Sequence, residues 1–400
     1  MSTTDLPLAR FDARPNHGPV VAGGIIALAV AMGIGRFAFT LLLPLMLRDG
    51  TLNPADGAEW AAANYAGYLV GALTAAWFSG DPVRGLRVSL AGVALTTLAM
   101  AVAGHPVPIA VGALLRAAAG IFSAWALVCA SGWCLAELAR REVPRLGAWI
   151  YAGVGLGIAL TGLLAWLGGR QPAARLWLEL GALAAFGALV VGLLSRRQGA
   201  RPAGPAEREA ASVARGAGQG ALVLAYGTFG FGYIVPATFL PAMARDLAPD
   251  PLVFGLAWPL FGLAALVSVA VAARLLAGVP RRRLWAVAQG TMALGTALPL
   301  AVHALWAVAA SAVLVGGTFM LATMAGLQLA REARPDAPTP LLARMTAAFA
   351  AGQILGPLLV RALGPGRWAG LDALDLTGAL ATLLLALTAL WLWRAGRAPV

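Results

Sequence analysis

Residues 33–49 read GIGRFAFTLLLPLMLRD, and residues 230–246 read GFGYIVPATFLPAMARD. The two stretches lie 197 residues apart and share both glycines and the ending Leu-Pro-x-Met-x-Arg-Asp. Because the shared residues include types rarer than Ala and Gly, chance pairing in an Ala-rich chain does not explain the match. The sequence therefore contains an internal repeat, with each stretch occupying the same position in one of two halves.

Other glycines fit the repeat, although chance pairing is a serious alternative for them in a chain so rich in Gly and Ala. They recur at offsets of 197 and 199 residues, placing Gly120 on Gly317, Gly153 on Gly352 and Gly157 on Gly356. Two halves in the same orientation are typical of parallel-repeat transporters, whose substrate site lies between the halves near the bilayer centre.

The composition places this repeat in a membrane. Of the 400 residues 60% are hydrophobic and 12% charged, whereas a soluble domain carries about 25% charged residues. The apolar runs are continuous, which excludes the alternating strands of an outer-membrane barrel. We predict an all-α polytopic membrane protein with twelve transmembrane helices in two six-helix repeats.

A window of about 19 residues locates the twelve helix cores. They span 20–46, 59–79, 86–104, 107–134, 147–168, 175–194, 220–243, 252–276, 284–302, 304–328, 341–363 and 371–393. We predict an N-terminal tail at 1–18, an N-terminal half at 19–194, a linker at 195–219, a C-terminal half at 220–393 and a C-terminal tail at 394–400. The linker is rich in Arg, Ala, Gly and Pro and falls at mid-chain.

The charges predict the orientation. All 29 basic residues are Arg, and most flank the apolar runs, which argues against a nucleic-acid partner. Assigned to the predicted connections, 21 arginines fall on one side and six on the other, leaving Arg36 and Arg116 inside helices. Basic loops stay in the cytoplasm. We therefore expect an inner-membrane protein with both termini cytoplasmic.

Neither the cysteines nor the histidines form a recognisable metal or catalytic centre. Cys129 and Cys134 lie in one predicted helix at a spacing that suits neither a disulfide nor a metal site. His17 falls in the N-terminal tail, and His105 and His303 fall at loop ends. We expect no cofactor, no metal and no enzymatic activity, and we expect a monomer whose partners are the lipid bilayer and a small-molecule substrate.

Five motifs resemble the YbfB/YjiJ-type transporters of the major facilitator superfamily. They are Met32–Met46, Asn64–Gly71, Leu115–Gly120, Tyr151–Gly157 and Gly352–Pro357. The resemblance runs through nearly the whole chain. It implies the major facilitator fold and a role in transport, without naming a substrate.

The resemblance also suggests roles for individual residues. Arg116 and Gly120 match the Arg-x-x-x-Gly signature that the superfamily links to proton coupling. The glycine-rich helix five is similar to that of exporters, although it lacks their Gly-Pro pair. The loop signature between helices two and three survives in part, which implies that Asp81 and Arg84 latch neighbouring helix ends.

Arg36 and Arg116 are the strongest candidates for binding substrate. A charge at the bilayer centre costs about 3 kcal/mol or more, so such residues normally face a cavity or a partner. Both arginines fall in a similar layer of helices that line the central cavity in the superfamily, and no acid lies deep enough to pair with them. Unpaired guanidinium groups suit carboxylate or phosphate. The structural alternative is that each arginine caps backbone carbonyls or extends to the interface.

Further candidates surround this layer. Tyr233 sits at the repeat position of Arg36, and Tyr226 lies on its stripe. Asn64 and Tyr68 share a face of helix two, where Asn64 could equally bond between helices. Gln353 is a candidate donor that could instead satisfy the backbone at a proline kink. Trp125 and Trp258 could stack on substrate, but packing is the favoured interpretation.

Glycine pairs spaced by four residues permit close helix approach. They are Gly67 with Gly71, Gly153 with Gly157, and Gly352 with Gly356. Packing is the favoured role. We expect a mechanistic role to be indirect, as smooth seams along which the halves slide.

These observations favour a secondary transporter of a small organic anion that works by alternating access. Without an internal carboxylate, proton coupling would depend on a protonated substrate or a loop-end acid. The alternative within transport is a broad-specificity exporter of amphipathic compounds, favoured by the aromatic content and the glycine-rich helix five. A membrane enzyme would need a cluster of acids or histidines at a membrane face, which we do not find.

Overall fold

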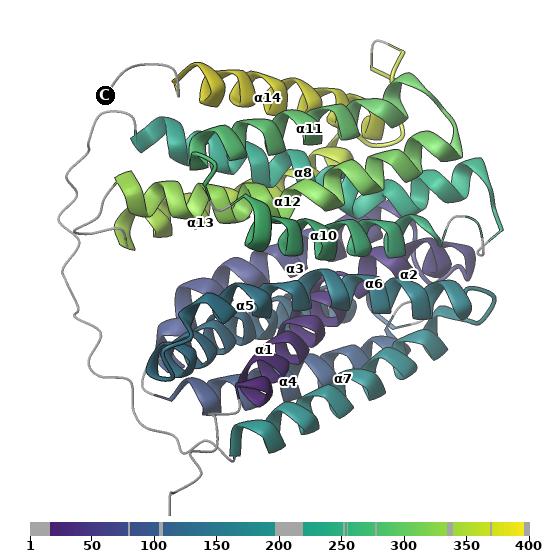
Figure 1. Cartoon of the computed structure of the whole chain (residues 1–400). Coiled ribbons are helices and arrows are strands. Elements are labelled where there is room, and N and C mark those ends of the chain that lie inside the picture. Colours follow the sequence, from purple (N-terminus) through teal and green to yellow (C-terminus); the bar gives the residue numbers. More distant parts are fainter. Residues whose placement is uncertain are drawn as a thin grey trace, which may run out of the picture.

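The computed structural model describes residues 17–78, 81–103, 107–196, 219–250, 253, 255–276, 278–333, 339–368 and 370–395. Most residues of the predicted tails and linker lie outside this described part, so the predicted domain boundaries remain predictions. His105 lies outside it as well. In the described part, twelve long helices run roughly side by side (Figure 1).

Helix one consists of three consecutive pieces, α1 (Gly18–Leu28), η1 (Ala29–Arg36) and α2 (Ala38–Arg48). The rest of the N-terminal half comprises α3 (Pro54–Thr74), η2 (Ala75–Phe78), α4 (Pro82–Ala99), η3 (Met100–Val102), α5 (Ile109–Arg140), η4 (Pro144–Tyr151), α6 (Ala152–Leu167) and α7 (Ala173–Arg196). The C-terminal half comprises α8 (Gln219–Leu247), α10 (Ala257–Leu275), α11 (Arg281–Ala301), α12 (Leu305–Ala333), α13 (Thr339–Leu363) and α14 (Ala373–Ala395). The twelve-helix prediction is confirmed.

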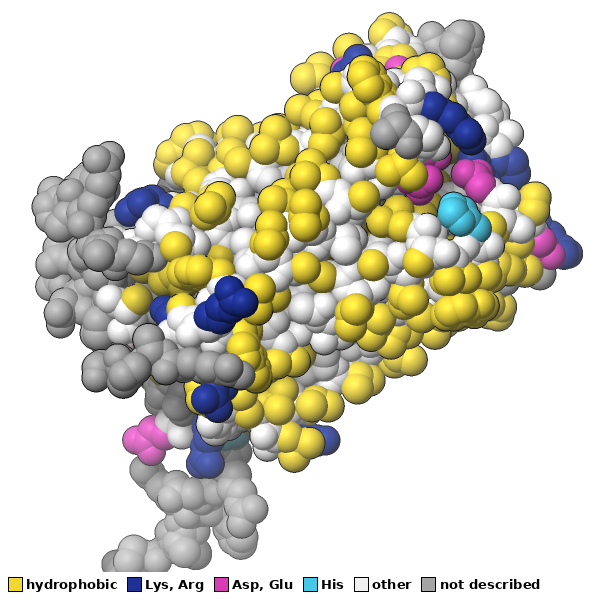
Figure 2. All heavy atoms as spheres, turned by 90° about the horizontal axis from the view of Figure 1, so that it is seen from above, with side chains coloured by type: hydrophobic (Ala, Val, Ile, Leu, Met, Phe, Trp, Pro, Cys, Tyr) yellow, Lys and Arg dark blue, Asp and Glu magenta, His cyan; other side chains and the backbone are white. Residues whose placement is uncertain are grey.

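The helices have the length and surface of membrane spans. Ten of them are long and apolar enough to cross a bilayer, and α10 contains a shorter apolar stretch. Side chains such as Leu73, Leu114 and Phe186 are exposed at the surface. The face in Figure 2 carries hydrophobic side chains along its middle and charged ones towards its two ends, as expected where lipid replaces water.

Helix packing repeats between the halves, which lie one above the other in Figure 1. The contact α3–α5 has its counterpart in α10–α12, α4–α5 in α11–α12, α4–α7 in α11–α14, and η1–α6 in α8–α13. The halves meet along α3–α13 and α6–α10, which are also repeat-related, and α2 additionally contacts α8. The sequence repeat is therefore an approximate two-fold symmetry of the structure.

The predicted glycine pairs all pack within a half. A Cβ at Gly67 or Gly71 would overlap the backbone of α5, and one at Gly153 or Gly157 would overlap the backbone of helix one. Gly352 packs in the same way on α8. The expectation that these pairs form the sliding seams is wrong, because each faces a helix of its own half.

Other glycines lie on the seam between the halves. Gly155 and Gly162 of α6 press against α10, and Gly262 of α10 presses against the backbone of α6 at Ala159. Because these residues lack a Cβ, two helices of different halves can approach backbone to backbone.

Candidate functional site

Helix one is interrupted at the centre of the bundle. Its middle piece η1 is a π-helix, and the Phe37 N–H donates to the Met32 carbonyl five residues back, at 3.1 Å. Gly33 lies against Gly157 so closely that a Cβ would overlap the neighbouring backbone. Segments of π-helix are frequent at functional sites, and this one ends at Arg36.

Arg116 binds the backbone carbonyls at the end of the π-helix. From α5, its Nη1 donates to the Gly35 carbonyl at 3.2 Å and its Nη2 to the Arg36 carbonyl at 3.0 Å. The guanidinium also lies over the Phe39 ring, 4.9 Å from its centroid. A cation at the carbonyl end of a helical segment is favourable. The structure thus shows Arg116 in the carbonyl-capping role that the sequence left as an alternative, while its Nε is buried and has no partner among the described residues.

The side chain of Arg36 is enclosed by aromatic rings. Its Cζ lies 4.3 Å from the centroid of Tyr68, 5.4 Å from that of Phe37 and 5.7 Å from that of Tyr65. Its exposed fraction is 3%. Aromatic faces attract a desolvated guanidinium by up to about 2 kcal/mol each, which offsets part of the cost of burying the charge.

The two repeat-related positions meet directly. The Nη2 of Arg36 donates to the Tyr233 hydroxyl at 3.2 Å, and the Nε2 of Gln353 donates to the same hydroxyl at 2.7 Å. Each half supplies one partner of the first bond, and both tyrosine and glutamine come from the C-terminal half. A second bond crosses between the halves beside it, joining the hydroxyls of Tyr65 and Thr238 at 3.0 Å.

Tyr233 is held by stacking. Its ring is parallel to those of Phe319 and Phe349, with an interplanar angle of 7° and centroids 5.6 Å away in each case. Tyr226 lies nearer the start of α8 than Tyr233, with its ring centroid 5.3 Å from that of Phe349 and 5.7 Å from that of Trp285. The C-terminal half therefore presents a rigid aromatic platform to the arginine of the N-terminal half.

The site has positive charge without a carboxylate. Within the described chain, no carboxylate forms an ion pair with Arg36 or Arg116, and the ion pairs present join residues at or near helix ends (for example Arg141 with Glu137). The Nε of Arg36 and the Oε1 of Gln353 are buried and have no partner among the described residues. Such groups would accept a ligand carrying both an anionic oxygen and a donor.

Several predicted residues have mainly packing roles. The Nδ2 of Asn64 donates to the Arg116 carbonyl at 2.8 Å, so Asn64 joins α3 to α5. Trp125 donates to the Thr74 hydroxyl at 2.9 Å. Trp258 stacks on Phe261 with centroids 4.8 Å apart. These contacts correspond to the packing alternatives considered from the sequence.

The helix-end latch differs from the one that the loop signature implied. Asp81 accepts from the Arg84 N–H at 2.9 Å and so caps its own helix α4. The side chain of Arg84 is exposed and makes no ion pair with the described residues. Instead Arg87 donates to the Ser195 hydroxyl from Nε at 3.2 Å and Nη2 at 3.0 Å, which joins α4 to α7.

Sequence reasoning missed three contributors, Tyr65, Thr238 and Phe319. Tyr65 precedes Tyr68 by three residues and could have been found from helical spacing. Thr238 lies five residues after Tyr233 in the repeated stretch, but its repeat partner is a leucine, so the repeat carried no signal. From sequence alone, Phe319 is indistinguishable from a packing residue.

Comparisons with known proteins agree with this architecture. The family model described as "Uncharacterised MFS-type transporter YbfB" matches residues 28–391. No curated protein sequence matches significantly. A mutant form of the nucleoside transporter NupG superposes with a TM-score of 0.71 at 12% identity, covering 94% of this chain and 99% of that one.

A second solved structure, that of a D-xylose–proton symporter, superposes with a TM-score of 0.70 at 14% identity, covering 94% of this chain and 96% of the symporter. At such identities the likeness shows the fold alone. The family, in contrast, is shown by the family model, which matches most of the chain. The chain belongs to the YbfB-type family of the major facilitator superfamily, and it is a membrane transporter.

Proposed function

We propose that the protein carries a small organic anion across the cytoplasmic membrane by alternating access, with Arg36 as the anchor of the anion. The observation that carries the proposal is the setting of Arg36, which is buried where the halves meet and has no carboxylate partner in the described chain. Burial of an uncompensated charge is costly, and a visiting anion removes that cost.

Contacts between the halves support the alternating movement. At the end with few arginines, Arg361 pairs with Glu59 at 2.6 Å and Arg245 donates to the Pro44 carbonyl at 3.5 Å. At the Arg-rich end, Arg274 lies over the Trp149 ring, 5.2 Å from its centroid. These polar and cation–π contacts are individually weak, so substrate binding could shift the balance between them.

The same charge pattern bears on coupling and orientation. Because the site holds no acid, we propose that any proton travels on the substrate or on an acid at a helix end. We further propose that the Arg-rich end is cytoplasmic. Cysteines replacing the exposed Arg283 and Arg175, in a chain lacking Cys129 and Cys134, would report this on intact cells. An impermeant thiol reagent should label position 175 and spare position 283.

We propose a monomer that acts as a transporter and has neither enzymatic activity nor a nucleic-acid partner. A second function, export of amphipathic compounds, is favoured by the aromatic platform of Tyr233, Phe319 and Phe349. Flat rings accept apolar bodies of many shapes, and their faces also attract organic cations. The two functions differ in the charge of the ligand.

A ligand screen distinguishes them. Purified protein would be heated with carboxylates, phosphates, amino acids or lipophilic cations, because binding to the folded state raises its unfolding temperature. At a ligand concentration 100-fold above Kd the gain is about 2.7 kcal/mol. We expect stabilisation by at least one anion class in the parent and its loss in Arg36→Gln. Stabilisation by lipophilic cations alone would favour the exporter and contradict the anion site.

A further inference from the structure

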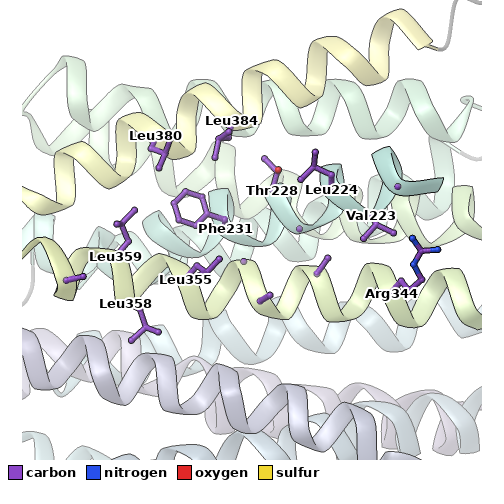
Figure 3. Close-up of a pocket in the computed structure, with 16 residues that line it drawn as sticks. Val223, Leu224, Thr228, Phe231, Arg344, Leu355, Leu358, Leu359, Leu380 and Leu384 are labelled. Carbon is purple, nitrogen blue, oxygen red and sulfur yellow. The ribbon is translucent and has the colours of Figure 1, made fainter. Parts of the chain in front are cut away.

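A large groove lies away from Arg36, among α8, α13 and α14. Its volume is about 910 Å³. In Figure 3, Leu380 and Leu384 project from α14 towards Phe231 on α8, and Leu355 lines the side formed by α13. The lining is apolar except for Thr228 and for Arg344, which stands at one end of the groove.

The groove opens to lipid and runs along the membrane normal. On α13 its lining extends from Arg344 to Ala362, which at 1.5 Å per residue is roughly 27 Å and approaches the 30 Å of a bilayer's hydrocarbon core. Leu224 and Leu355 at its rim are 69% and 59% exposed. A groove of this length with an apolar lining matches an acyl chain rather than a water-soluble molecule.

Arg344 supplies the charge that a lipid headgroup needs. It is exposed at the Arg-rich end, and its guanidinium has no ion pair or hydrogen bond with the described residues. Among the described residues that line the groove, Arg344 is the one with a charged side chain. Basic pockets between transmembrane helices on the cytoplasmic side suit anionic headgroups.

We propose that this groove binds one anionic phospholipid of the leaflet at the Arg-rich end, with its phosphate on Arg344 and an acyl chain along α13 and α14. The floor of the groove includes Phe231 and Gly352, which lie two and one residues from Tyr233 and Gln353. The lipid therefore packs behind the two helices that carry the C-terminal part of the site. This binding is separate from the proposed transport of an anion at Arg36.

The test measures the unfolding temperature of the purified full-length protein in a neutral detergent. Dioleoyl phosphatidylglycerol, dioleoyl phosphatidylcholine or glycerol 3-phosphate would be added. We expect phosphatidylglycerol to raise the unfolding temperature by several degrees more than phosphatidylcholine. Any effect of glycerol 3-phosphate, which as a small anion could bind at Arg36, should not depend on Arg344. In Arg344→Gln the difference between the two lipids should disappear. In the matched control Arg283→Gln, which removes an exposed arginine outside the groove, the difference should persist.

A second variant tests the acyl chain. Leu380→Trp narrows the groove without touching Arg344, and it should weaken stabilisation by phosphatidylglycerol. Native mass spectrometry of the parent should also retain one phosphatidylglycerol in preference to phosphatidylcholine, which tests the proposal even if a variant does not fold. Equal effects of both lipids, an effect of glycerol 3-phosphate that is lost in Arg344→Gln, or an undiminished lipid preference in Arg344→Gln would each overturn the proposal.

Discussion

Helix one and helix seven descend from the same repeat, yet they are built differently at the level where they meet. In helix one the chain changes to π-helix over Ala29–Arg36 and presents a charge. In helix seven, α8 continues unbroken from Gln219 to Leu247, despite two internal prolines, and presents Tyr233. The symmetry places both positions on the axis, where Arg36 and Tyr233 bond to each other.

Because of this difference, two similar halves form one asymmetric site. Two arginines facing each other on the axis would repel, and two tyrosines would leave no charge for an anion. With one arginine and one tyrosine, the C-terminal half supplies the hydroxyl that accepts a hydrogen bond from the charged group of the N-terminal half. The interruption in helix one also frees carbonyls that Arg116 occupies. If this is so, variants of Arg116 and Tyr233 should mainly change stability, whereas variants of Arg36 should mainly change the affinity for an anion.

The largest effect on stability is expected from Arg116→Gln. The shorter neutral side chain cannot reach both carbonyls of Gly35 and Arg36, and hydrogen bonds to charged groups contribute about 1.5 to 3 kcal/mol each. We expect the free energy of unfolding to fall by roughly 3 kcal/mol, measured by thermal or chemical unfolding in detergent. Ligand affinity per folded molecule should change less than in Arg36→Gln. The reverse order would show that Arg116 contacts the ligand.

Gly157→Ala should be the next most damaging. Its Cβ would overlap the backbone of Ala29, the first residue of the π-helix, and overpacking typically costs about 1 to 3 kcal/mol. At the repeat position Gly356, a Cβ would meet the Cγ2 of Ile234 at 2.7 Å, and a side chain can move where a backbone cannot. Gly356→Ala should therefore cost less. Gly192→Ala, with open space around it, is the control that should not destabilise.

Tyr233→Phe should have an intermediate effect. It leaves Nη2 of Arg36 and Nε2 of Gln353 without their acceptor, which costs about 1 to 3 kcal/mol for buried groups. Tyr65→Phe removes a single neutral bond to Thr238 and should cost about 1 kcal/mol. Unfolding temperatures of the two variants test this order. Equal losses would mean that the central hydroxyl has no special role.

The smallest effect on stability is expected at the rim. Glu59 and Arg361 are 36% and 44% exposed as side chains, so their ion pair contributes at most about 1 kcal/mol. Glu59→Gln should leave the unfolding temperature nearly unchanged. It should lengthen the distance between spin labels at Arg48 and Arg245 in part of the population, because the halves lose a contact at that end. A distribution identical to that of the parent would exclude a gating role.

Much of the fold could be predicted because lipid imposes strong constraints on sequence. Continuous apolar runs located all twelve helices, and the recurrence of Gly33 and Pro44 at Gly230 and Pro241 located the halves. Near the site, the repeat correctly brought Tyr233 opposite Arg36. Sequence alone could not choose between the two fates of a buried arginine. Carbonyl capping and anion binding require the same residue, and only the course of the neighbouring backbone separates them.

The π-helix and the seam between the halves were also beyond prediction. The π-helix lies where Gly33 closely approaches Gly157 of another helix, and the sequence does not show which helices come together. Likewise, a pair of small residues four positions apart predicts close packing against another helix, but the pattern does not say which helix. Gly155 and Gly162 fall on the seam between the halves, whereas Gly153 and Gly157 face helix one.

The most direct test of the central claim compares anion binding by the parent, Arg36→Gln and Arg36→Lys, each measured per folded molecule with the anion that stabilises the parent most. Loss of the charge-assisted contact is worth roughly 1.5 to 3 kcal/mol, which corresponds to a ten- to hundredfold weaker affinity in Arg36→Gln. Arg36→Lys should recover part of that loss, because lysine restores the charge without the planar fork. Unchanged affinity in Arg36→Gln would contradict the claim that this arginine anchors the substrate.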